Sequence, residues 1–239
     1  MLIISAGMQK SGSGWLFNLI NDLLIASGFD DVRSLKDKYH LDSVLQYYNC
    51  NIGCLTKENL LPALSLSSNK HTFVVKTHEG PGDYLGSIFD EHPIRTTYIF
   101  RDPRAVALSA FDHGIKLRRS GESGSFSEIY TFHDSINFAS GLFKIWKAWT
   151  DFPGTFIVKY EDLVNDTQKA LIMLANHLVL NMKSDQISEI ITSNLPGVRK
   201  GTHFNVGDAT RYLRVWTPEQ LKYANDVLGE MILRMGYPI

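Results

Sequence analysis

Short apolar runs alternate with longer segments of helical periodicity along this chain. Four runs rich in β-branched or aromatic residues predict buried strands, at residues 2–6, 71–76, 96–100 and 155–159. After the first run, leucine and isoleucine recur at helical spacing through residues 16–24. Strands that alternate with helices indicate an α/β fold with a central, mostly parallel sheet flanked by helices, and we expect one domain over residues 1–239.

Capping residues predict where later helices begin. Asp102 and Pro103 read as an N-cap and first helical residue, and Thr217-Pro218-Glu219-Gln220 reads as a capping box that opens a final helix ending near Gly236. A further helix is predicted from about Asp134 to Thr150. Residues 118–127, rich in glycine and serine, are expected to form a lid, a binding loop or plain surface.

Charge and composition narrow the classes of partner. Lysine and arginine number 24 against 25 acidic residues, so an overall basic field for nucleic acid is absent and any anion must be held by local cations. The apolar runs are far shorter than the roughly 20 residues of a membrane span, and no secretory signal is visible, so we expect no membrane partner and a cytoplasmic location. Cys50 and Cys54 lack the C-x-x-C spacing and are expected to be reduced thiols.

A glycine- and serine-rich loop, residues 7–15, lies between the first predicted strand and helix. There, backbone N–H groups and the helix dipole favour an anion, and Lys10 adds charge. The nucleotide-kinase loop needs lysine directly after its last glycine, whereas Lys10 precedes Gly12. The loop alone is also compatible with an ordinary tight turn.

The order of residues in this loop is more specific. Lys10-Ser11-Gly12-Ser13-Gly14-Trp15 resembles the P-K-S-G-T-T-W loop of the sulfotransferase family, which uses 3′-phosphoadenosine 5′-phosphosulfate (PAPS) as sulfuryl donor. The resemblance implies that the lysine, serines and glycine hold the 5′-phosphosulfate and that Trp15 stacks on adenine. Gly14 replaces a threonine of the family, and its backbone N–H can still donate.

Two further segments follow in the family's order. Lys76-Thr77-His78 is similar to its K-T-H strand end, which implies that His78 takes the proton of the acceptor and that Lys76 helps to bind or neutralise the transferring group. Arg101 and Ser109 match the pair that binds the 3′-phosphate, and Ser109 is expected to link that phosphate to Lys10. Taken singly, His78 and Arg101 are also compatible with structural roles.

The last two matches are weaker. Tyr160, in Tyr160-Glu161-Asp162-Leu163, matches a tyrosine that lies near the adenine in the family, and we expect Glu161 and Asp162 to be structural. Arg199-Lys200-Gly201 resembles the late family loop that closes over the 3′-phosphate. Together these elements predict the P-loop-like sulfotransferase fold.

The resemblance implies in-line transfer from PAPS to a hydroxyl or amine of a small acceptor, with adenosine 3′,5′-bisphosphate (PAP) as product. Lys10 would neutralise the leaving oxygen, and neutral His78 would accept the proton. A sulfuryl group carries less charge than a terminal phosphoryl group, so we expect no required metal, and the histidines show no metal-ligand spacing.

Several questions stay open at this point. The acceptor could be a phenol, alcohol, amine, sugar or peptide side chain, and the oligomeric state is unknown because the family's usual dimerisation signature is missing. Two rival functions remain, a kinase using ATP and Mg²⁺, and a non-catalytic nucleotide-binding module.

Overall fold

Four parallel strands form the centre of the protein. The computed structural model describes residues 1–195 and 208–239, and within them the strand order is β2-β1-β3-β4. The strands are β1 (Leu2–Gly7), β2 (Phe73–Thr77), β3 (Ile94–Phe100) and β4 (Thr155–Lys159). Every residue of β1 and β2 is buried, as expected of parallel strands that are covered on both faces. The predicted fold class is therefore confirmed, although β2 begins at Phe73 rather than residue 71.

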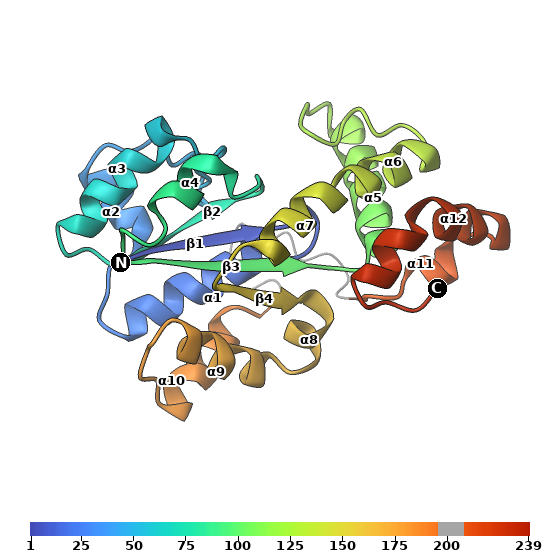
Figure 1. Ribbon diagram of the computed structural model, residues 1–239. Helices are drawn as coiled ribbons and strands as arrows, with labels where there is room; N and C mark the ends of the chain where they lie inside the picture. The colour runs from blue at the N-terminus through green and yellow to red at the C-terminus, as the bar shows by residue number, and fades with distance from the viewer. Residues whose placement is uncertain (196–207) are drawn as a thin grey trace.

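Helices cover both faces of the sheet and gather at one end of it. α1 packs against β1 and β2, and α7 packs against β3 and β4. Figure 1 shows α5, α6, α11 and α12 together beyond the carboxyl ends of the strands. The helices are α1 (Ser13–Ala26), α2 (Val32–Lys38), α3 (Lys57–Ser68), α4 (Gly82–Ile88), α5 (Pro103–Ser120), α6 (Phe132–Gly141), α7 (Phe143–Asp151), α8 (Tyr160–Asn165), α9 (Thr167–His177), α10 (Ser184–Ser193), α11 (Tyr212–Val215) and α12 (Pro218–Arg234).

The predicted helix starts at α5 and α12 are confirmed. The Asp102 side chain accepts a hydrogen bond from the backbone N–H of Arg104, with Pro103 as first helical residue. Thr217 and Gln220 form the predicted capping box of α12. Leucine and isoleucine side chains on the inner face of α1 are fully buried against the sheet, namely Leu16, Leu19, Ile20, Leu23 and Leu24.

Two predicted segments are corrected. The helix expected from Asp134 to Thr150 is two helices, because α6 ends at Gly141, a poor helix former, and α7 begins after Leu142. Asp134 is not its first residue but the capping partner of Thr131. The segment 118–127 is partly helical, since α5 continues through Ser120 and ends at the left-handed Gly121.

The rest of the segment 118–127 is tied to α5. Nη1 of Arg118 donates to the backbone oxygens of Ser127 (2.8 Å) and Ile129 (2.9 Å). These bonds fold the loop back along α5 and fix the backbone directly after Phe126. Within the described residues, no helix has both the length and the apolar character that crossing a membrane requires.

A buried polar network fastens the C-terminal helices to the start of α5. Arg104 forms a bidentate ion pair with Asp102 (3.1 and 2.8 Å), and both side chains are buried. Arg104 also donates to the backbone oxygen of Pro238 (2.7 Å), and the Tyr212 hydroxyl donates to Asp102 (3.0 Å). Glu161 accepts from the backbone N–H of Asp102 (3.3 Å), in agreement with its predicted structural role. The network therefore fixes the backbone directly after β3.

We predict that Arg104→Met lowers the free energy of unfolding by about 3 kcal/mol, because it leaves a carboxylate buried without its cation. Urea denaturation followed by circular dichroism measures this loss. Arg234→Met, which breaks an exposed pair with Glu230, is the matched control and should cost less than about 0.5 kcal/mol. A loss for Arg104→Met no larger than that of the control would contradict the role given to the network.

Candidate active site

The residues singled out from the sequence gather where the parallel strands end. Lys10 follows β1, His78 follows β2, Arg101 follows β3 and Tyr160 follows β4. The carboxyl ends of parallel strands share one edge, and ligands of open α/β sheets bind there at the point where the strand order reverses. β1 and β3 are neighbours in the sheet, and β1 connects onward to β2 on its other side. The loops after β1 and β3 therefore flank that point.

Steric contacts explain two glycines of the first loop. A side-chain carbon at Gly7 would lie 2.6 Å from Cγ2 of Ile99 and 2.7 Å from Cβ of Ser13. Gly12 has a φ of 83°, and a side chain there would lie 2.9 Å from the ring of Tyr160. Lys10 itself has a left-handed φ of 65°. The loop is therefore a tight turn pressed between β3 and Tyr160.

The turn leaves the N-terminus of α1 available to an anion. Gly12 precedes the helix and provides no side-chain cap, so the first N–H groups of α1 have no partner within the helix. A side-chain carbon at Gly14 would meet nothing within 4 Å, whereas Ser13 and Trp15 are largely buried. The N–H groups of Ser13 and Gly14 are therefore suited to hold phosphate or sulfate oxygens.

Ser11 holds the loop together. Its buried hydroxyl donates to the backbone oxygens of Met8 and, at 3.2 Å, of Ile99. The hydroxyl proton is thus engaged with the protein, which leaves only the oxygen lone pairs and nearby N–H groups for other contacts. The expected contact of Ser11 with phosphate stays a prediction.

Lys10 is the half-buried cation of the loop. Burial lowers the pKa of Lys10 to about 8, and the positive charges of Arg101 and Lys116 add to the shift. Its ammonium lies 5.0 Å from the ring centre of Phe126. The segment 118–127, predicted as a lid, a binding loop or surface, therefore reaches the phosphate loop through Phe126, a contact that nothing in the local sequence indicates.

His78 and Lys76 face one another beneath the loop. Nδ1 of His78 lies 2.7 Å from the Gly7 backbone oxygen, and because a carbonyl can only accept, Nδ1 carries the proton. Nε2 therefore carries the lone pair, and it accepts from Nζ of Lys76 at 2.6 Å. Burial and the charge of Lys76 lower the pKa of His78 to about 4, and burial lowers the pKa of Lys76 to about 7. His78 is thus a neutral base near pH 7.

Arg101 and Tyr160 form the other side of the site. The guanidinium lies 4.4 Å from the ring centre of Tyr160, and Nη2 donates to the Asp208 backbone oxygen at 2.9 Å. Nε of Arg101 is buried and has no hydrogen-bond partner among the described residues. Ser109 lies two turns into α5, half-buried. Arg199, Lys200 and Gly201 lie outside the described residues.

Long-range packing brings in residues that the sequence patterns do not single out. Lys116 and Phe126 act on Lys10, and Arg211 pairs with Asp112. Among residues 1–195 and 208–239, no group of three or more histidine, cysteine, aspartate or glutamate side chains is placed to hold a metal ion.

Comparison with known proteins identifies a family to which the chain is similar. Residues 2–202 match the protein family described as "Sulfotransferase domain". Human sulfotransferase 1E1 is 25% identical over 195 residues, an alignment that covers 79% of this chain and 63% of the relative. The chain therefore spans less than two thirds of that relative.

Solved structures share the fold. Retinol dehydratase in complex with androsterone and the inactive cofactor PAP superposes with a TM-score of 0.62 at 19% identity, covering 100% of this chain and 82% of that chain. Mouse sulfotransferase SULT7A1 complexed with PAP gives 0.65 at 14% identity, with 97% and 84% covered. The sulfotransferase domain from the curacin biosynthetic pathway gives 0.55 at 13% identity, with 100% and 98% covered.

The depressed pKa of Lys76 predicts how stability depends on pH. Between pH 7 and 9 the unfolded chain keeps a proton on Lys76 that the folded chain releases, so the free energy of unfolding rises with pH in this interval. Lys76→Met removes this contribution. We expect the rise in its free energy of unfolding from pH 7 to pH 9 to be smaller than that of the wild type by about 2 kcal/mol.

Denaturation at pH 7, 8 and 9 measures the difference. Lys169→Met, which removes an exposed lysine on α9, should follow the wild type and serves as the matched control. If the free energy of unfolding rises with pH equally in Lys76→Met and the wild type, the folded state does not lower the pKa of Lys76.

Proposed function

We propose a function for this chain, which belongs to the sulfotransferase domain family: it transfers the sulfuryl group of PAPS to a hydroxyl or amine of a small acceptor. The observation that carries the proposal is the convergence of Lys10, His78 and Arg101 at one sheet edge, around the open N-terminus of α1. Anion-binding groups and a neutral base thus lie side by side.

The residues of the site fit a nucleotide that carries phosphate groups at both the 5′ and the 3′ position of its ribose. The N–H groups at the start of α1, with Lys10, suit the 5′-phosphosulfate. Arg101 suits the 3′-phosphate, because its buried Nε has no hydrogen-bond partner among the described residues and its guanidinium lies over the ring of Tyr160. Positive charges that lower the pKa of Lys10 are relieved when an anion binds between them. The donor supplies the sulfuryl group, and the protein supplies position and charge.

The chemical step balances with a single base. The acceptor oxygen or nitrogen forms a bond to sulfur as the bond from sulfur to the bridging phosphate oxygen breaks. The electron pair of the broken bond stays on the phosphate, where Lys10 compensates its charge, and the acceptor proton passes to Nε2 of His78. The Gly7 carbonyl holds His78 in the tautomer that leaves Nε2 free of a proton.

In this structure Nζ of Lys76 is hydrogen-bonded to Nε2 of His78. The acceptor hydroxyl or amine must therefore displace Lys76 from that nitrogen. Because burial makes the Lys76 ammonium costly, its displacement toward the negatively charged sulfuryl oxygens is favourable. Lys76 thereby gives up its hydrogen bond to Nε2 of His78 and instead binds the sulfuryl group that is transferred. The cations of the chain supply the required positive charge, and we infer that no divalent metal is needed.

We predict a strong preference for PAP over related nucleotides in calorimetric titration. PAP should bind at least about 100-fold more tightly than 5′-AMP, because the 3′-phosphate adds charge-assisted hydrogen bonds. Arg101→Gln should weaken PAP binding by about tenfold or more and change 5′-AMP binding by less than about threefold. Binding of ATP with Mg²⁺ in place of PAP would instead favour a kinase.

Removing the base separates catalysis from binding. His78→Ala should lower turnover by about 100- to 10,000-fold, while PAP affinity stays within about threefold of the wild type. The assay follows PAP release from PAPS with phenol, alcohol and amine acceptors in excess EDTA, and exposed His133→Ala is the matched control. Unchanged turnover in His78→Ala would mean that another group acts as the base. If the wild type is inactive in EDTA but active with Mg²⁺, the inference that no divalent metal is needed is wrong.

A further inference from the structure

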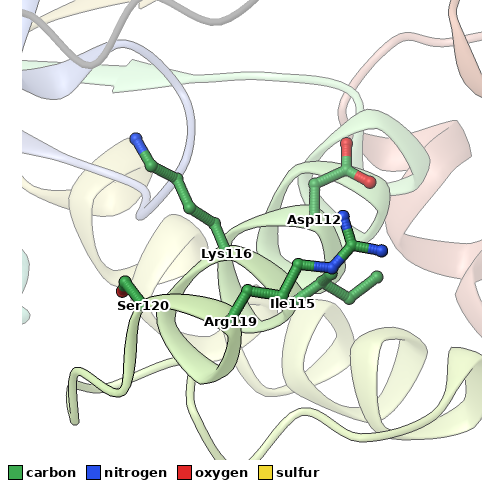
Figure 2. A pocket seen from close by; sticks show the side chains of 5 residues that line it. All are labelled: Asp112, Ile115, Lys116, Arg119 and Ser120. Carbon is green, nitrogen blue, oxygen red and sulfur yellow. The ribbon is translucent and has the colours of Figure 1, made fainter.

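An open hollow of about 570 Å³ lies against one face of α5. Figure 2 shows the lining side chains projecting from this helix. Their spacing of three, four and seven residues places them on one helical face. The lining residues are Asp112, Ile115, Lys116, Arg119 and Ser120.

The hollow presents uncompensated positive charge. Asp112, its one acid, is already bound to Arg211. Lys116 and Arg119 are exposed and form no ion pair with any described residue. Residues 196–207 contain no aspartate or glutamate, so that stretch cannot supply a carboxylate to them. Two cations thus remain available to an external anion.

The hollow adjoins the proposed reaction site. Lys116 extends toward the blue loop after β1 in Figure 2, and its charge acts on Lys10. The same helix begins two residues after Arg101 and carries Ser109 two turns before Lys116. A molecule in the hollow therefore contacts a helix face whose lysine acts on Lys10, so it lies near the proposed reaction site rather than on a remote surface.

We propose that the acceptor carries an anionic group, such as a carboxylate, phosphate or sulfate, which Lys116 and Arg119 bind while its hydroxyl or amine faces His78. This inference rests on the proposed function, because it assigns the acceptor of that reaction. Ile115 provides apolar contact for the carbon skeleton between the two polar ends. Since exposed ion pairs are individually weak and screened by salt, the selectivity expected from two cations is about five- to tenfold at low ionic strength.

Calorimetry on the intact protein saturated with PAP tests the proposal without requiring turnover. Two matched pairs are compared, 4-hydroxyphenylacetate with its amide and 4-hydroxybutyrate with its amide. In at least one pair the acid should bind about five- to tenfold more tightly than the amide, and 0.5 M NaCl should reduce the ratio to about two. The double variant Lys116→Gln with Arg119→Gln, compared at a PAP concentration that saturates it, should reduce the ratio likewise.

The control is Lys169→Gln, an exposed lysine on α9, which should keep the preference of the wild type. The absence of acid preference in both pairs, or a preference that survives in the double variant, overturns the anionic acceptor. PAP binding is measured first on its own. Its failure would overturn the proposed donor, a result distinct from a PAP-binding protein that does not discriminate acids from amides.

Discussion

The hydrogen bond from Nδ1 of His78 to the Gly7 carbonyl links the two halves of the site. It joins the end of β2 to the turn after β1, and it decides which imidazole nitrogen holds the proton. The turn can offer that carbonyl only because Gly7 has no side chain to collide with Ile99 and Ser13. One backbone oxygen of the loop therefore holds the base in the tautomer that can accept a proton.

The site concentrates positive charge at a cost in stability. Lys10, Lys76 and Arg101 lie at the same sheet edge. Burial lowers the pKa of both lysines, and the positive charge of Arg101 adds to the shift of Lys10. Such strain is typical of sites built for an anion, because the ligand supplies the missing charge on arrival. Folding is held by other contacts, among them the Asp102–Arg104 network, which uses charge in balanced pairs. The fold thus separates the groups that stabilise it from the groups that bind.

Local patterns in the sequence predict what depends on local structure. The buried runs, the caps of α5 and α12 and the order of motifs at the strand ends are all short-range features, and the structure places Lys10, His78, Arg101 and Tyr160 at one edge. The contacts between them are long-range and leave no local signal. The Lys76–His78 contact depends on side-chain direction at the end of β2, and the approach of Phe126 to Lys10 depends on how a distant loop folds back. The break between α6 and α7 escaped prediction because the apolar spacing continues across Leu142.

In the proposed function, α5 connects the donor side of the site to its acceptor side. Its first residues are fixed by Asp102 and Arg104, and its last turn is fixed where Arg118 anchors the returning loop. A helix rises about 1.5 Å per residue, so Ser109 and Lys116 are separated by roughly 10 Å along the axis of α5, and the helix keeps this separation fixed. Any acceptor bound through Lys116 is therefore held at a set distance from a donor bound near Ser109. Under this proposal, changes of side chain on the exposed face of α5 would alter which acceptor is bound, while the buried face of the helix keeps its packing against the rest of the protein.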